Sequence, residues 1–530
     1  MLFTSYEFLA FLGILLVLYY AVPRKWQWGL LLIASYVFYA FGGVRYLAFV
    51  LLTTVSAYAA SRLMGRVTEK EQAFLSGAGA DLPKEERKAF RARQKRKRLH
   101  VLTLALVLNF GVLAVLKYTG FAVYNVNELL HNFGAERTLN VPDLLLPMGI
   151  SFYTFQTCGY LIDVYRAKAT VQRNPFKLAL FVSFFPQVIQ GPISRYEALS
   201  KTLFAEHRLE AKALHNGLWR ILWGYFKKLV IADRILVAVR FLADNTAEYT
   251  GVYVVLMILF YSVQIYADFT GGIDITIGIA EALGIRVAEN FVRPFSSKST
   301  KEYWNRWHIT MGTWFTDYIF YPLSVSRPML SLSKSSRKLL GKAVGKRIPV
   351  YTATVATWFL TGLWHGAGWN FIVWGLLNCV VILISQECEP LYRRFRERAP
   401  RLTSSVPYTK FMAVRTFLLM GLIRSLDVYR DVPLTFRMWG SMVTQFNLSV
   451  LFSGGLTPLG LSAVDYVILA VGVAVMSIVS RLGVKRSVRD RLYDRPVLSA
   501  ALFGTLLVCV LLFGAYGVGY DATQFIYNQF

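Results

Sequence analysis

The chain has 530 residues, of which 55% are hydrophobic and 15% aromatic, and its formal net charge is +27. Repeated apolar stretches of near bilayer-spanning length predict an all-α polytopic membrane protein and exclude a large soluble domain. The positive charge suggests nucleic-acid binding at first sight, but no recognition module is visible, so no nucleic-acid partner is expected.

Apolar segments predict roughly 11–13 membrane helices plus re-entrant and interfacial helices in one membrane domain, 1–530. The basic pair Arg24-Lys25 follows the first apolar core, so a cleavable signal peptide is not expected. The segments lie near 8–22, 26–43, 46–64, 99–119, 144–165, 177–193, 217–240, 251–268, 351–364, 369–386, 411–427, 465–481 and 497–516.

Basic residues gather between these segments. Residues 65–98 hold eleven Lys and Arg against five Asp and Glu, residues 324–349 hold seven against none, and residues 481–495 hold six against two. This is the positive-inside pattern, so 65–98 and 324–349 are predicted to be basic cytoplasmic loops that set orientation. Both the N-terminus and the C-terminal tail, 517–530, are then predicted to lie outside.

Two regions resist this topology. Gly191-Pro192 and Lys227-Lys228 interrupt residues 177–240, where we expect one broken or re-entrant helix. The apolar piece from Gly272 to Ile285 follows Asp268 and is too short to span a bilayer. Irregular backbone at membrane depth is tolerated only beside protein or a water-filled cavity, so these breaks suggest a cavity within the bundle.

The segment 300–322 is predicted to be a helix at the cytoplasmic interface. In helical spacing Trp304, Asn305 and His308 share one face with Met311 and Phe315. Asp317 is half a turn out of phase with His308, so an Asp–His relay within this helix is not implied. Aromatic anchoring at the interface is the alternative interpretation.

His365 lies in a turn between two apolar runs, within Trp364-His365-Gly366-Ala-Gly-Trp-Asn370, and the chain holds six histidines in all. An imidazole at membrane depth suggests function, whereas the alternative is a hydrogen-bonded core histidine. The topology puts His308 near the cytoplasmic face and His365 on the opposite side or near the centre. Such residues suit a general base along a passage through the bilayer.

Other chemistry finds little support. No GxSxG nucleophile motif occurs, so base-assisted attack of an acceptor hydroxyl on a thioester is the simpler proposal. The four cysteines show neither zinc-type spacing nor a disulfide framework, and no metal site is predicted; they are Cys158, Cys379, Cys388 and Cys509.

Several motifs together resemble the membrane-bound O-acyltransferase family, in its bacterial branch that acylates cell-envelope polymers such as alginate. They are the Trp-His-Gly-Ala turn, Glu-Tyr-Trp-Asn-Arg-Trp-His-Ile ending at Ile309, Leu146-Pro-Met-Gly-Ile-Ser-Phe-Tyr153 and Asp268-Phe-Thr-Gly. The resemblance implies a ring of helices around a central tunnel. It also implies that His365 is catalytic and that His308 takes part. We further expect the tunnel or substrate site to be lined by Trp304, Asn305, Arg306, Trp364 and Asn370.

One departure weakens inference about the substrate: many relatives carry Phe-Arg-Ala late in the chain, where this sequence reads Gly421-Leu-Ile-Arg424-Ser425. Arg306, with Lys301 and Lys298, would suit contacts to the phosphates of an acyl donor, although lipid headgroups are an equally plain partner.

The function expected from this resemblance is transmembrane O-acyl transfer in the bacterial cytoplasmic membrane. Acetyl-CoA is the expected donor, with an acyl carrier protein as the alternative, and D-alanyl, succinyl or longer acyl groups remain open. The acceptor would be an extracytoplasmic polysaccharide or peptidoglycan, reached through a hydrolase-like acyltransferase partner. A glycan or lipid transporter or flippase is the first alternative, and a scaffold subunit is the second.

The C-terminal tail, 517–530, has no Lys or Arg and ends Phe525-Ile-Tyr527-Asn-Gln-Phe530. It resembles the C-terminus of the small helper protein of teichoic-acid D-alanylation, whose tyrosine is proposed to carry the acyl group. The resulting hypothesis is an acyl relay through Tyr527. An aromatic tail resting at the outer interface is the alternative.

Overall fold

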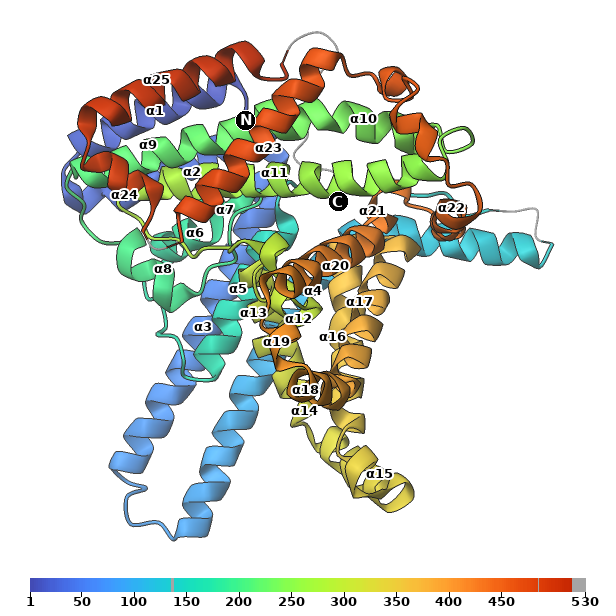
Figure 1. The fold of residues 1–530 in the computed structure, drawn as a ribbon. Helices are drawn as coiled ribbons and strands as arrows, with labels where there is room; N and C mark the ends of the chain where they lie inside the picture. Colours follow the sequence, from blue (N-terminus) through green and yellow to red (C-terminus); the bar gives the residue numbers. More distant parts are fainter. Residues whose placement is uncertain (135–137, 485, 517–530) are drawn as a thin grey trace. The chain divides into compact units, whose positions relative to one another are not determined.

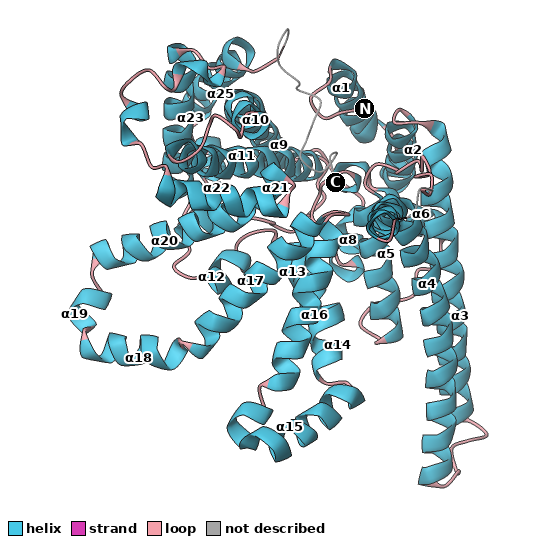
Figure 2. Ribbon diagram, turned by 90° about the vertical axis from the view of Figure 1, so that its right-hand side faces the viewer, coloured by secondary structure: helices cyan, strands magenta, loops and turns pink. Residues whose placement is uncertain are grey.

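The computed structural model describes residues 1–134, 138–484 and 486–516, in which every regular element is helical (Figures 1 and 2). The all-α prediction is therefore confirmed. The chain divides into two compact units, here called unit 1 (residues 1–214 and 279–287) and unit 2 (residues 215–278 and 288–530). The tail that carries Tyr527 lies outside the described residues, and a single membrane domain and a tunnel stay predictions.

Unit 1 contains the first helices of the chain. They are α1 (Tyr6–Ala21), η1 (Arg24–Trp26), α2 (Gln27–Ala40), η2 (Val44–Tyr46), α3 (Leu47–Ser76), α4 (Lys84–Asn132), α5 (Ile150–Tyr165), α6 (Pro175–Ser183), α7 (Phe185–Val188) and α8 (Tyr196–Leu203).

Unit 2 holds most of the remaining elements, and only the first residues of α9 and the last turn of α11 are grouped with unit 1. The elements are α9 (Ala211–Tyr225), η3 (Phe226–Ala232), α10 (Asp233–Asp244), α11 (Val252–Ala282), η4 (Pro294–Ser296), α12 (Thr300–Trp304), α13 (Ile309–Phe315), η5 (Thr316–Phe320), α14 (Tyr321–Ser324), α15 (Arg327–Gly345), α16 (Ile348–His365), α17 (Trp369–Glu387), α18 (Glu389–Arg398), α19 (Pro400–Thr403), α20 (Val406–Arg424), α21 (Leu426–Tyr429), α22 (Val432–Thr444), η6 (Leu448–Leu451), η7 (Thr457–Leu459), α23 (Ala463–Leu482), α24 (Val488–Tyr493) and α25 (Pro496–Phe513).

Six helices of the described chain are long and apolar enough to cross a membrane. They are Val44–Ser76, Lys84–Asn132, Val252–Ala282, Trp369–Glu387, Ala463–Leu482 and Pro496–Phe513. Other apolar segments form shorter helices such as α1. The sequence therefore predicted more membrane helices, 11–13, than the six described helices that meet this length and composition.

The two basic regions predicted to be loops are largely helical. All the charges of 65–98 except Asp81 lie on the ends of α3 and α4, which run side by side and are joined by a short turn (Figures 1 and 2). Five of the seven basic residues of 324–349 lie on α15, which Gly341 kinks at φ +79°, and Lys346 and Arg347 lie between α15 and α16. Lys, Arg and Glu are good helix formers, so a charged run extends a helix as readily as it forms a loop.

The predicted break at Gly191-Pro192 is confirmed, because residues 189–195 are not helical although nearly all are buried. Gln187 satisfies this backbone by donating through Nε2 to the Pro192 oxygen at 2.8 Å and to Ser194 Oγ at 2.6 Å. Gly149 starts α5 at φ +73°, where a Cβ would lie 1.9 Å from the Val188 oxygen, so only glycine fits.

The breaks expected at Lys227-Lys228 and after Asp268 are wrong. The lysines lie in η3, a π-helical continuation of α9, and α11 runs unbroken through Asp268, Gly271 and Gly278. A Cβ on Gly271 would lie 2.9 Å from the Gly224 oxygen, and one on Gly278 would lie 2.8 Å from the Gly217 oxygen. These glycines bring α9 and α11 into backbone contact instead of ending a helix.

Candidate active site

His308 does not belong to a continuous helix. It lies between α12 and α13 in the left-handed region, at φ 48° and ψ 51°, so the predicted shared face from Trp304 to Phe315 is wrong. The segment 290–292 imposes this conformation from outside. The Val292 amide donates to the Arg306 oxygen at 3.0 Å, and the Ile309 amide donates to the Asn290 oxygen at 3.0 Å. A non-glycine residue persists in this strained conformation only where its surroundings enforce it.

Asn290 also sets the hydrogen bonding of the His308 ring. Its Oδ1 accepts from the amide and the hydroxyl of Thr310, each at 3.0 Å. The Asn290 amide nitrogen lies 3.2 Å from His308 Nδ1. Because Oδ1 is occupied by these two donors, we assign the amide nitrogen as donor to Nδ1, which makes Nδ1 an acceptor and places the ring proton of neutral His308 on Nε2.

Trp364 contacts both of the predicted catalytic histidines. Its ring centroid is 5.8 Å from that of His308 and 5.0 Å from that of His365, and its side chain is 5% exposed. The two imidazoles therefore do not lie on opposite sides of a bilayer core about 30 Å thick. His308 is fully buried, and His365 is partly exposed.

His365 is the last residue of α16 and precedes the turn into α17, as the sequence predicted. Two glycines hold these helices in close contact. A Cβ on Gly362 would lie 2.4 Å from the Phe371 oxygen, and one on Gly375 would lie 2.4 Å from the Trp358 oxygen. His365 thus lies at the end of a closely packed helical pair.

Ring contacts link His365 to Trp304 through Trp374. Trp374 packs edge-on against His365 with ring centroids 4.5 Å apart, and it packs against Trp304 at 5.6 Å. Trp304 donates through Nε1 to Asn378 Oδ1 at 3.2 Å. The predicted residue Trp304 therefore reaches the same cluster as His365.

A second aromatic group surrounds Trp307 and His308. Phe269 of α11 lies edge-on to both rings, at 6.2 and 4.9 Å, and Tyr303 stacks on Trp307 at 5.6 Å. The Asp268-Phe-Thr-Gly motif thus contributes an aromatic face to the histidine site.

Arg424 brings a positive charge to this aromatic cluster. Its guanidinium lies 4.1 Å from the centroid of Trp307 and donates to the Tyr303 hydroxyl at 3.2 Å. His308 lies outside the six candidate membrane spans. Burial, with a smaller contribution from the positive Arg424, lowers the pKa of His308, so its imidazole is neutral at neutral pH.

The remaining predicted site residues have diverse positions. Asn370 is buried and donates to the Leu426 oxygen at 3.2 Å, which ties α17 to α21. Arg306 pairs with Glu302 at 2.6 Å, and Asn305 is exposed at the end of α12. Lys298 and Lys301 are both exposed.

Sequence reasoning missed Asn290, Tyr303, Trp307, Trp374 and Asn378 as members of the site. Arg424 was noticed only as a departure from a motif, although an arginine at the end of the apolar helix α20 is itself a signal of function. Among the described residues, no group of three or more His, Cys, Asp or Glu side chains could hold a metal ion.

Comparison with known proteins gives a consistent result. The membrane-bound O-acyltransferase family matches residues 170–422, which include both histidines. The chain is 35% identical over 380 residues to "Probable alginate O-acetylase AlgI" of Azotobacter vinelandii, covering 71% of this chain and 66% of that relative, just under two thirds.

Two further relatives align over longer stretches. AlgI of Pseudomonas aeruginosa is 32% identical over 479 residues, covering 89% of this chain and 81% of the relative. "Peptidoglycan O-acetyltransferase" of Helicobacter pylori is 29% identical over 422 residues, covering 74% and 70%.

Proposed function

This chain belongs to the membrane-bound O-acyltransferase family and is a multi-pass membrane O-acyltransferase, and from this premise we propose that it carries acetyl groups to a cell-envelope polysaccharide. Acetyl-CoA in the cytosol is the proposed donor, and the acceptor lies outside the cytoplasmic membrane. The names of the alginate and peptidoglycan O-acetylating relatives support an acetyl group and a polymeric acceptor.

The observation that carries the mechanism is that His308 and His365 both contact Trp364. In the proposed reaction, His365 removes the proton from the acceptor hydroxyl as its oxygen attacks the thioester carbonyl carbon. The carbon–sulfur bond then breaks, and the proton moves from His365 to the departing thiolate. His365 is partly exposed and lies beside the turn between α16 and α17, which suits a side chain that contacts a substrate.

We assign His308 a different role, as a hydrogen-bond donor. With Nδ1 accepting from Asn290, the neutral ring carries its proton on Nε2 and has no lone pair there to act as a base. An N–H held in a buried aromatic site can stabilise the negative charge that develops on the carbonyl oxygen. The lowered pKa of His308 supports a neutral donor at neutral pH.

The Tyr527 relay is kept as a separate part of the proposal. Acetyl would pass from the thioester to the phenol oxygen of Tyr527, releasing coenzyme A, and then to an extracytoplasmic transferase that serves the polymer. Support comes from the tail sequence alone, since Tyr527 lies outside the described residues.

The test is acyl transfer in membranes supplied with radiolabelled acetyl-CoA. We expect label on the polymer and on the C-terminal peptide in the wild type, and on neither in His365→Ala. His100→Ala is the matched control, because His100 is exposed on α4. Label on the polymer without label on the tail, or full acylation by Tyr527→Phe, would remove the relay and keep the transferase. Label that is independent of His365 would refute the proposed base.

A further inference from the structure

Unit 2 contains a cavity that the proposed reaction does not use. A slot of about 820 Å³ lies among α9, η3, α11, α23, α24 and α25. This volume is within the range of small-molecule sites, roughly 300–1,000 Å³. Along α23 the lining runs from Val467 to Gly483, which is roughly 24 Å at the helical rise per residue.

The slot is apolar along most of this length. Valines and other aliphatic residues of α23 and α25 form one side, including Val471, Val475 and Leu506, and Phe226 contributes from η3. Both α23 and α25 are candidate membrane spans, with only 17% and 11% of their most apolar windows buried inside the protein. The slot therefore opens between helices whose outer faces suit contact with lipid chains.

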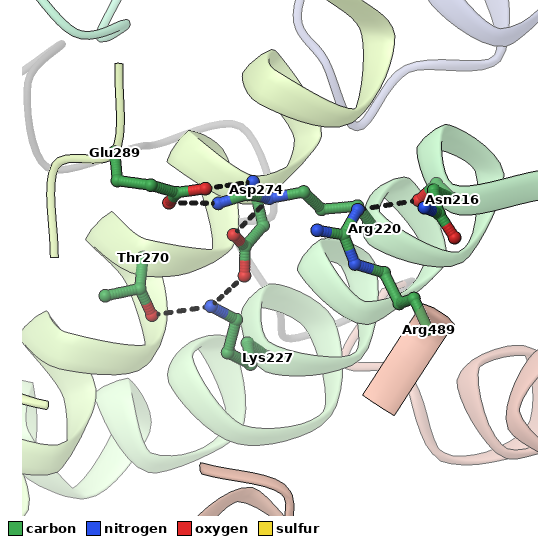
Figure 3. Close-up of polar contacts among 7 residues, drawn as sticks. All are labelled: Asn216, Arg220, Lys227, Thr270, Asp274, Glu289 and Arg489. Atoms are coloured by element: carbon green, nitrogen blue, oxygen red, sulfur yellow. Dashed lines mark hydrogen bonds and ion pairs between the residues drawn. The ribbon is translucent and has the colours of Figure 1, made fainter. Parts of the chain in front are cut away.

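The end of the slot near α24 is charged. Arg220 of α9 donates through Nη1 and Nη2 to the two oxygens of Glu289, each at 2.6 Å, and through Nε to Asp274 at 2.8 Å (Figure 3). Lys227 bonds the other oxygen of Asp274 at 2.6 Å. These pairs balance one another, so the cluster forms a polar end without a large net charge.

Arg489 adds a further positive charge at this end. It reaches the slot from α24, and its Nη1 donates to the Asn216 oxygen at 2.9 Å (Figure 3). It belongs to residues 481–495, which hold six Lys and Arg against two Asp and Glu. Basic pockets between membrane helices on the cytoplasmic side are known sites for lipid headgroups, and guanidinium suits phosphate.

We propose that this slot binds one anionic phospholipid of the surrounding bilayer, with an acyl chain between α23 and α25 and its phosphate at Arg489. The apolar length and the charged end match the two parts of such a molecule. The site is separate from the histidines and does not depend on the proposed acyl transfer.

The first test is native mass spectrometry of the full chain after detergent exchange. We expect the wild type to retain one phospholipid, and Val475→Trp, which fills the slot, to retain roughly tenfold less, as a lost apolar site predicts. Ile478→Trp is the matched control, because Ile478 lies on the same helix, is exposed and does not line the slot. Equal retention in the two variants, or none in the wild type, would overturn the proposal.

The second test concerns the phosphate. Delipidated protein would be titrated with phosphatidylglycerol and with diacylglycerol, which has the same chains but no phosphate. We expect tighter binding of phosphatidylglycerol and a roughly tenfold loss in Arg489→Gln, as for a charge-assisted hydrogen bond. Arg486→Gln should bind normally, since Arg486 pairs with Asp494 and does not line the slot. Equal affinity for the two lipids would refute the assigned headgroup position.

Discussion

The histidine site and the ion-pair cluster, both in unit 2, use buried charge in opposite ways. Around Trp364 and Trp307, two imidazoles lie among aromatic rings, and Arg424 is the neighbouring cation. In the ion-pair cluster, by contrast, Arg220 of α9 and Lys227 of η3 are paired with carboxylates, and Lys228 contacts both Asp233 and Asp268 at 2.7 Å.

From this difference we infer that the histidine site serves catalysis and that the ion-pair cluster stabilises the fold. Buried ion pairs hold their charges in place, because separating them leaves an uncompensated charge in a low dielectric. An imidazole that is not tied to a carboxylate, as proposed for His365, can gain and lose a proton without breaking an ion pair, as proton transfer requires. We therefore expect substitutions in the first region to change rate, and substitutions in the second to change stability.

The largest effect is expected at His365. His365→Ala should lower the rate of acyl transfer by about 10²–10⁴, the usual contribution of a positioned general base. Initial rates with acetyl-CoA would measure this, and the melting temperature should stay near that of the wild type. A matching fall in melting temperature would mean that His365 stabilises the fold instead of taking part in catalysis.

His308 distinguishes a donor from a base. His308→Ala should lower the rate by about 10²–10³, as removal of an oxyanion donor does. His308→Gln keeps an N–H at a similar reach and should recover about tenfold of that loss. Rates of the two variants at saturating donor would show this. If Gln and Ala were equally inactive, His308 would not act as a simple hydrogen-bond donor.

Lys228 tests the ion-pair cluster. Lys228→Met leaves Asp233 and Asp268 buried without their shared cation, and we expect a loss of roughly 3–5 kcal/mol in stability. Thermal unfolding in detergent would measure it. Lys88→Met is the control, because Lys88 pairs with Glu85 on an exposed face and should unfold as the wild type does.

The smallest expected effect is a dependence on pH. Because the folded pKa of His308 is lowered, the unfolded chain binds a proton below about pH 6.5 that the folded chain does not. Stability therefore rises with pH and falls on acidification, by up to about 1.4 kcal/mol per pH unit.

His308→Gln removes this group, so its melting temperature should fall less than that of the wild type between about pH 7 and about pH 5. An identical fall in both proteins would mean that other groups dominate the acid response.

Local composition was enough to predict the class of protein and the place of His365. Apolar runs of near-spanning length predict membrane helices, and the Gly-rich turn between two such runs predicts the ends of α16 and α17. The break at Gly191-Pro192 was predictable for the same reason, since proline and glycine act through their own backbone preferences.

Other features have no local signature. Gly271 and Gly278 look like helix breakers in the sequence, but they pack α11 against the backbone of α9. The basic residues of 65–98 look like a loop, but they lengthen α3 and α4. A glycine can end a helix or let two helices pack closely, and a basic run can form a loop or lengthen a helix. The neighbouring element decides which of the two structures forms.

The sequence by itself determined that this is an all-helical membrane protein with a histidine in a turn, because hydrophobic length and turn residues are local properties. Only the tertiary structure decided what surrounds His308. Asn290 reaches its ring from a separate segment, Trp364 links it to His365, and Arg424 lies more than a hundred residues away in the chain. Contacts over such separations depend on how whole elements pack, and no local pattern of residues encodes them.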